Sequence, residues 1–238
     1  MLKIILRSLL MMFLFGCLKQ ENIPQTLIHK AIDYHGGMEA WELWDSIHFH
    51  KKSIIYFENG QKESEKSEYY HIKLHPTFSV KVVENDSIVI LFDQNHYSKY
   101  MTTSERILPI TKQDTTTIES ALFVIGQLFL LKDGNNKLTY QGMEQIMGEE
   151  CHVIRADYNV QGKENHSWWY YISTHDFRLI ASRVYHSPHY ALIVNESYQK
   201  FQDILWNQER TTYRVDSLNT IQFIRAKYVY DFGENMSM

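Results

Sequence analysis

The chain has no run of basic residues, and its charge is slightly acidic. It contains 24 Lys and Arg against 28 Asp and Glu among 238 residues. A nucleic-acid partner requires clustered cations that neutralise phosphates, so we expect none. The same balance argues against a surface held to anionic lipid by charge alone.

The motifs of the common enzyme classes are also missing. There is no Gly-x-Ser-x-Gly, no glycine loop that cradles phosphate and no dinucleotide fingerprint. Glu149 and Glu150 form an acidic pair, but adjacent strand residues point to opposite faces, which suits paired-carboxylate catalysis poorly. We therefore expect a protein that is not an enzyme, with no catalytic residues and no cofactor.

Histidine is common, with 12 residues, but its spacing does not indicate a metal site. His48 and His50 share one face of a predicted strand, as do His71 and His75. Zinc needs three or four protein ligands, and no helical His-Glu-x-x-His is present. Strand histidines that face solvent are the favoured interpretation, with a metal site as the alternative.

The longest apolar run near the N-terminus is too short for a membrane span. From Ile4 to Phe15 it falls below the roughly 20 residues that a bilayer needs, and Arg7 interrupts it. Its basic start, apolar middle and small residue at the end predict a signal peptide over residues 1–16. Leu14-Phe15-Gly16-Cys17 resembles the lipobox of bacterial lipoproteins, which implies lipid attachment at Cys17. A permanent anchor and an ordinary cleaved signal are the alternatives.

Export defines the mature chain as residues 17–238. It has a short lipidated tether at 17–21, a net charge of −6 and one remaining cysteine, Cys151. No intramolecular disulfide can then form, and Cys151 in its strand-like run is expected to be a buried thiol. Leu18 stands where an aspartate is associated with inner-membrane retention. We therefore expect an outer-membrane lipoprotein, facing the periplasm or the outside.

The first element of the mature domain, 22–238, is predicted to be a helix at Asn22–Tyr34. Asn22 can cap it, Pro24 suits its first turn, and an apolar stripe follows. His35-Gly36-Gly37 ends it, because glycine adopts the left-handed conformation readily. Residues 38–44 add a short turn that packs Trp41 and Trp44 onto the domain.

Strands in which apolar and polar residues alternate are predicted over most of the remaining chain. One set runs from residue 47 to 57 and then through Glu68–His75, Phe78–Val83, Ser87–Phe92 and Tyr97–Met101. The second set comprises Leu138–Met147, Cys151–Tyr158, Ser167–Ile172, Leu179–Tyr185, Ala191–Phe201, Glu209–Val215 and Ile221–Tyr230. The predicted fold is mainly β (α+β), with a single curved antiparallel sheet or half-open β-barrel of about 11–12 strands.

One apolar element interrupts the strands. Thr116 and Glu119 read as a capping box, and a helix is predicted over Ser120–Leu131 with apolar residues on every side. Such a helix must be buried, and at about 20 Å it is too short to span a membrane. We expect it inside the concave face of the sheet. A buried strand pair with a bend at Gly126 is the competing interpretation.

Three stretches together resemble the LolA and LolB lipoprotein-carrier fold, and more closely an uncharacterised group of bacterial lipoproteins with that architecture. The stretches are Ala31–Gly37 with Trp41 and Ile47–Phe49, then Tyr140–Ile154, then Trp169–Ile172 with Leu179-Ile180 and Tyr198–Phe201. The resemblance covers most of residues 22–232. The order of the motifs carries it, because each motif alone is weak.

The resemblance implies a half-open sheet around an apolar cavity that helices plug until a lipid chain displaces them. Phe123, Val124, Leu128 and Phe129 would then line or plug a pocket for a lipid or other hydrophobic ligand. The helix is equally consistent with permanent core. The alternative function is a structural or sensing lipoprotein with a packed interior that binds another envelope protein. A monomer held to the membrane by its lipid anchor is expected in either case.

Overall fold

The computed structural model describes residues 22–132, 136–158 and 166–233. Its helices are α2 (Ile23–Tyr34), α3 (Gly37–Glu42) and α4 (Lys112–Leu130). The first strands are β1 (Ser46–Tyr56), β2 (Lys62–Lys73), β3 (Ser79–Glu84), β4 (Ile88–Asp93) and β5 (His96–Met101). The others are β6 (Asn136–Ile146), β7 (Glu149–Tyr158), β8 (His166–Ser173), β9 (Leu179–His186), β10 (His189–Phe201), β11 (Ile204–Val215) and β12 (Ile221–Asp231). The predicted signal peptide, Cys17 and tether lie outside the described residues.

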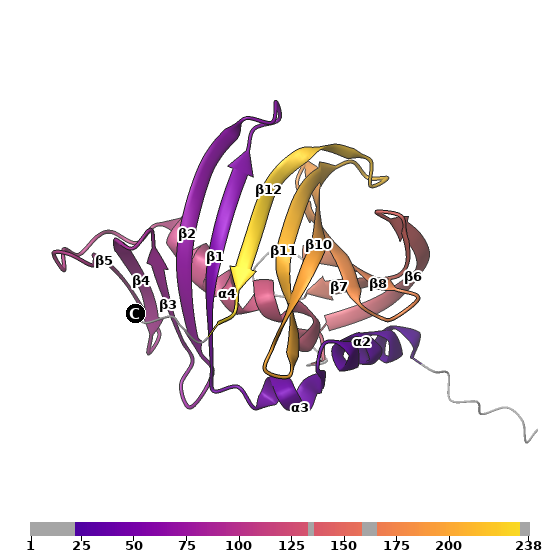
Figure 1. Cartoon of the computed structure of the whole chain (residues 1–238), viewed down its shortest axis with the longest axis horizontal. Coiled ribbons are helices and arrows are strands. Elements are labelled where there is room, and N and C mark those ends of the chain that lie inside the picture. The colour runs from indigo at the N-terminus through magenta and orange to yellow at the C-terminus, as the bar shows by residue number, and fades with distance from the viewer. Residues whose placement is uncertain (1–21, 133–135, 159–165, 234–238) are drawn as a thin grey trace, which may run out of the picture.

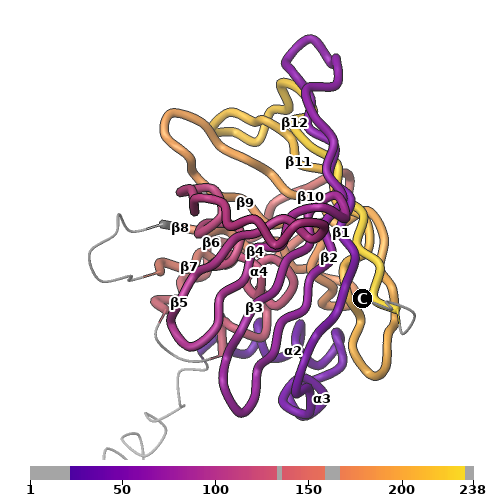
Figure 2. The backbone as a smooth tube through the Cα atoms, turned by 90° about the vertical axis from the view of Figure 1, so that its left-hand side faces the viewer, coloured from indigo at the N-terminus to yellow at the C-terminus, as the bar shows by residue number. Residues whose placement is uncertain are grey.

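All 12 strands form one antiparallel sheet, which confirms the predicted fold class. Their order is β5-β4-β3-β2-β1-β12-β11-β10-β9-β8-β7-β6, so β5 and β6 are its two edges. Figure 1 shows the sheet curving from β5 to β6, with α2 and α3 beside one end of it. Figure 2 shows the β1–β2 turn projecting at the opposite end.

The path of the chain explains the position of α4. Each strand pairs with the strand that precedes or follows it, except that β1 also pairs with β12 and that β5 and β6 lie at opposite edges. The connection from β5 to β6 must therefore cross the sheet, and α4 makes that crossing. It contacts β2, β3, β4 and α2 on the way. The predicted helix is thus confirmed on the sheet, and the competing strand pair is wrong.

The start of α4 differs from the sequence prediction. Thr111 is the N-cap, and its side chain and that of Asp114 form the capping box, so Thr116 and Glu119 lie within the helix. The Asp114 carboxylate also accepts a hydrogen bond from Lys99 Nζ at 2.9 Å, which ties the helix start to β5. The first two turns escaped prediction because they are polar and carry no apolar period.

The end of α2 agrees with the sequence prediction. α2 ends at Tyr34, and Gly36 and Gly37 take φ angles of 118° and 85°. Asn22 occupies the N-cap position, but its side chain makes no capping hydrogen bond. β2 begins at Lys62, earlier than predicted, because its charged and mostly exposed first residues show no apolar alternation.

Buried apolar residues lie on both faces of the second half of the sheet. Alternation along β7 places Cys151 and Val153 on one face and Ile154 and Ala156 on the other. The face with Ile154 joins the main core, which includes α2, α3 and α4. The opposite face holds a smaller cluster from β6 to β11. The main core is the one that positions the site.

Candidate ligand-binding cavity

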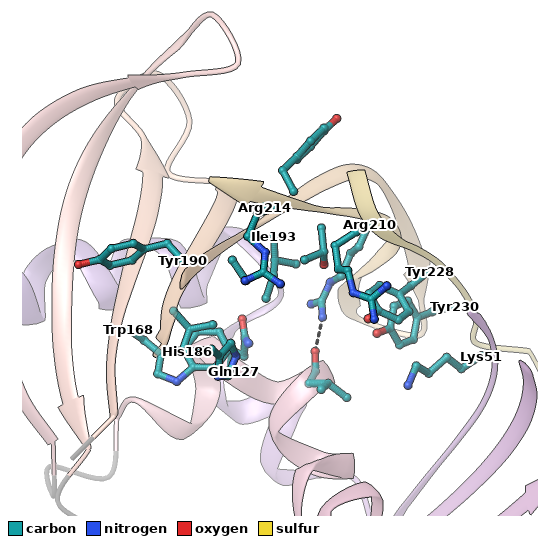
Figure 3. A pocket seen from close by; sticks show the side chains of 16 residues that line it. Lys51, Gln127, Trp168, His186, Tyr190, Ile193, Arg210, Arg214, Tyr228 and Tyr230 are labelled. Carbon is teal, nitrogen blue, oxygen red and sulfur yellow. Dashed lines mark hydrogen bonds between the residues drawn. The ribbon is translucent and has the colours of Figure 1, made fainter. Parts of the chain in front are cut away.

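A cavity of about 360 Å³ lies between α4 and the inner face of β8–β12. Figure 3 shows its lining, to which α4 contributes Val124 and Gln127. Apolar and aromatic walls come from the strands, chiefly Trp168, Val184, Ile193, Tyr228 and Tyr230. This volume falls at the lower end of the range for ligand pockets, about 300–1,000 Å³.

A kink in α4 lies beside the cavity. Gly126 has φ −102° and ψ 16°, which breaks the regular helix. The Trp41 ring occupies the space beside it, because a Cβ at position 126 would lie only 2.7 Å from Trp41 Cη2. The same ring stacks on Phe129, with centroids 4.5 Å apart. α3 and α4 are therefore packed tightly at the one position where α4 has no side chain.

The four predicted pocket residues point in different directions. Val124 lines the cavity. Phe123 is half-buried and meets the Tyr158 and Trp168 rings at 5.6 and 5.0 Å. Leu128 and Phe129 are each 4% exposed and belong to the main core. The structure thus brings one of the four to the cavity and places two in the main core.

Four cations line the cavity, and sequence reasoning missed them. They are Lys51 on β1, Arg210 and Arg214 on β11, and Arg225 on β12. Arg210, Thr212 and Arg214 alternate along one strand face, which was the available signal. Arg225 comes from the next strand, β12, and Lys51 comes from β1, which is distant in the sequence and lies there because it pairs with β12.

Arg210 has an unusual position, because its guanidinium is buried without an acidic partner among the described residues. Arg210 is 5% exposed, and its Nη1 donates a hydrogen bond to the Val124 carbonyl of α4 at 2.5 Å. Its Nε donates to Asn195 Oδ1 at 3.0 Å, and it lies 5.3 Å from the Tyr230 ring centre. Burying a cation without a counter-charge costs on the order of several kcal/mol in desolvation, unless hydrogen bonds offset that cost.

A chain of hydrogen bonds continues from Arg210 to the end of α2. Asn195 Nδ2 donates to the Leu179 carbonyl at 2.8 Å, and the Leu179 N–H donates to His35 Nε2 at 3.3 Å. His35 Nδ1 then donates to the Leu205 carbonyl at 2.8 Å. Burial lowers the pKa of His35 to about 4, so the ring is neutral and each nitrogen has a fixed role. The His-Gly-Gly motif therefore joins α2 to β9 and β11.

The remaining predicted features lie away from this cavity. His48 and His71 stack at 4.1 Å across β1 and β2, and His50 bonds Ser67 Oγ at 2.7 Å. No three His, Cys, Asp or Glu side chains of the described residues lie close enough to share a metal ion. Cys151 is buried, and desolvation raises the pKa of its thiol to about 12.

Within the described ranges, no helix combines the length and the apolarity needed to cross a bilayer. The longest, α4, has 19 residues, and its first turns are polar.

Three solved structures share this fold at low sequence identity. A DUF1329 family protein from Desulfovibrio piger has a TM-score of 0.58 at 9% identity, over 90% of this chain and 94% of its own. A LolA superfamily protein from Nitrosomonas europaea gives 0.55 at 11% identity, over 87% and 91%. A protein domain assigned to outer membrane lipoprotein sorting, from Vibrio parahaemolyticus, gives 0.51 at 10% identity, over 88% and 95%.

Neither family models nor curated proteins match the sequence. The structural likeness alone shows the fold, and it agrees with the resemblance carried by the sequence motifs. The chain has the LolA-like fold, with a curved antiparallel sheet and a helix across its inner face.

Proposed function

We propose that this chain is a membrane-anchored lipoprotein of the bacterial cell envelope that binds a lipid or other hydrophobic ligand between α4 and the sheet. The observation that carries the proposal is the cavity of about 360 Å³ beside the apolar half of α4. The names of two structures with the same fold, a LolA superfamily protein and a lipoprotein-sorting domain, support it. The ligand is held rather than transformed, so the protein is not an enzyme.

Binding of a long chain would enlarge the cavity by moving α4. Val124 lines the present space, and Phe123 lies against the aromatic wall of β7 and β8. Leu128 and Phe129 would leave the core as the helix moves, and an acyl chain would replace their contacts. Each buried methylene stabilises the bound state by about 0.8 kcal/mol. A ligand chain of ordinary length can therefore offset the lost helix packing.

The anchor would keep this site close to a membrane. In the proposal, residues 1–16 are removed as a signal peptide, Cys17 carries the lipid, and residues 17–21 form the tether to α2. A tether of five residues spans at most about 18 Å. The protein would act as a monomer at the outer membrane, on its periplasmic or outer side, and would take up or release ligand there.

Native mass spectrometry of the full chain recovered from membranes tests ligand binding. A co-purifying acyl species, and uptake of a fluorescent fatty acid by the emptied protein, are expected. Val124→Trp places a bulky ring in the cavity and should weaken uptake, whereas Ile107→Trp at a position that is 85% exposed should not. A bare protein mass without uptake would reject the proposal. The alternative of a structural or sensing lipoprotein, which the buried Leu128 and Phe129 favour, would then remain.

The anchor needs a separate test. Cells that express the full chain are labelled with an alkyne fatty acid, and label and membrane association are followed together. Cys17→Ser should remove both, while Cys151→Ser should remove neither, because Cys151 is buried in the folded domain. Label that persists in Cys17→Ser would refute the lipid attachment.

A further inference from the structure

The cations of the cavity set it apart from a purely apolar lipid pocket. Lys51, Arg210, Arg214 and Arg225 line it, and no Asp or Glu is among its lining residues. The full chain nevertheless has more acidic than basic residues, with a net charge of −4. Cations therefore gather inside this cavity against the overall charge of the protein.

Two of these cations already have acidic partners. Lys51 Nζ lies 3.3 Å from a Glu68 carboxylate oxygen, and Arg225 forms an ion pair with Glu63. These two side chains are neutralised by the protein itself.

Arg210 and Arg214 have no carboxylate within ion-pair distance in the described part of the chain. Arg210 bonds only neutral oxygens, those of Val124 and Asn195, through two of its five N–H groups. The Arg214 guanidinium lies 5.9 Å from the Phe223 ring centre and makes no side-chain hydrogen bond or ion pair among the described residues. Figure 3 shows both side chains at the cavity. Two positive charges on the wall of a largely apolar space lack a counter-ion.

An anion in the cavity would supply that counter-ion. Arg210 and Arg214 stand four residues apart on one strand face, about 13 Å between Cα atoms, so their long side chains can approach one group from both sides. Guanidinium groups bind carboxylates and phosphates through paired, charge-assisted hydrogen bonds. The aromatic walls at Trp168, Tyr228 and Tyr230 suit the adjoining apolar part of the same molecule.

We infer that the cavity binds an anionic amphiphile, whose carboxylate or phosphate head group is held by Arg210 and Arg214 while its chain lies along α4. This inference deepens the proposed function and rests on it. It names the head-group chemistry, which the fold does not specify. Neutral lipids and cationic amphiphiles should bind more weakly in spite of equal chain length.

The test compares three probes of one chain length on the full-length protein in amphipol: hexadecanoic acid, hexadecanol and hexadecylamine. Each displaces a fluorescent fatty acid from the protein. We expect the acid to bind at least tenfold more tightly than the alcohol, and the amine to bind most weakly. Dodecyl phosphate compared with dodecanol should show the same preference. Inorganic phosphate and acetate, as free anions, should not displace the probe at millimolar concentration.

Arg214→Gln should reduce the ratio of acid to alcohol affinity to about threefold or less. Arg210→Gln should do the same, but Arg214→Gln is the more decisive variant, because Arg214 makes no hydrogen bond to α4 in the described residues. Arg106→Gln removes an equal charge from an exposed side chain outside the cavity and should leave the ratio unchanged. Circular dichroism confirms that each variant is folded.

The outcomes separate this inference from the proposed function. Equal affinity for acid, alcohol and amine would overturn the inference and leave the proposed function intact. Binding of none of the probes would overturn both. Displacement of the fluorescent probe by inorganic phosphate alone would point to a site for free anions. It would overturn the inference that the ligand is an anionic amphiphile.

Discussion

Arg210 of the sheet donates a hydrogen bond to the carbonyl of Val124 in α4, with Nη1 and oxygen 2.5 Å apart. The bond lies two residues before the kink at Gly126, where regular helix geometry is interrupted. It joins β11 to the helix that crosses the sheet, and it does so at the wall of the cavity. The stability of α4 on the sheet should therefore depend on this guanidinium.

Arg210→Gln should loosen α4. A hydrogen bond from a charged donor contributes about 1.5–3 kcal/mol, so local opening should become roughly 10- to 150-fold more frequent. Hydrogen exchange of peptides from residues 118–130 measures this directly. Arg214→Gln also removes a cavity cation but no described bond to α4, and it should leave exchange near the wild-type rate. Equal protection in Arg210→Gln and wild type would contradict the role of the bond.

Gly126→Ala should destabilise the protein although alanine favours helix. Its Cβ would lie 2.7 Å from Trp41 Cη2, and overpacking of this kind costs about 1–3 kcal/mol, against about 1 kcal/mol gained in helix propensity. Thermal unfolding should show a lower midpoint. In Trp41→Phe the smaller ring leaves room, so adding Gly126→Ala there should cost less than in wild type. Simple additivity of the two changes would argue against the steric explanation.

Gly36→Ala and Gly37→Ala form a matched pair at the end of α2. Both glycines have positive φ, but a Cβ at position 36 would lie 2.2 Å from the Asp203 carbonyl oxygen, while one at 37 meets nothing within 4 Å. Gly37→Ala should cost only backbone strain, about 1–2 kcal/mol. Gly36→Ala should cost clearly more, or prevent folding, because backbone must shift. Urea unfolding of both variants ranks them, and similar midpoints would be inconsistent with the close approach.

His35 should make stability depend on pH. Its folded pKa of about 4 lies below the value near 6.5 expected in the unfolded chain, so the unfolded state binds the proton more readily. The contribution of neutral His35 to the free energy of unfolding is complete above pH 6.5. It is lost as pH falls towards 4, by about 3 kcal/mol in all. Urea unfolding at pH 7, 5.5 and 4.5 measures the loss.

His35→Gln is the control for this pH effect. It should be less stable at pH 7, because the bonds to Leu179 and Leu205 are weakened. Its stability should fall less between pH 7 and 4.5, since glutamine does not titrate. The same pH slope in variant and wild type would assign the effect to other histidines, such as His48, whose pKa burial also lowers.

The sequence predicted the parts of the fold that local patterns control. Apolar alternation found the strands, and the His-Gly-Gly motif located the end of α2. An apolar run, interrupted only by Gly126 and Gln127, identified α4 from Ser120 onward. The true start at Lys112 was missed because Thr111 and Asp114 cap a polar turn, and nothing in its apolar pattern distinguishes that turn from a loop.

The candidate site was less accessible from the sequence, for a physical reason. Val124 was predicted together with Phe123, Leu128 and Phe129, because the resemblance to the carrier fold implies that this apolar helix lines or plugs a pocket, but the resemblance could not say which of its side chains face the cavity. Lys51 lies at the cavity because β1 pairs with β12, a contact between strands far apart in the sequence, whereas Arg225 lies there through the adjacent β11–β12 pair. Long-range pairing of that kind leaves no local pattern, so Lys51 could not be placed at the cavity from the sequence, although the alternation of Arg210 and Arg214 on β11 was visible there.

The contact between Trp41 and α4 has an optical consequence. The indole ring stacks on Phe129 and covers Gly126, and it is only 8% exposed. Any movement of α4 away from the sheet would admit water to this ring and change its fluorescence. Trp168 lines the cavity itself and meets Phe123 of the same helix. In the proposed function, where α4 moves when a ligand enters, these two indoles would report ligand entry in unlabelled protein.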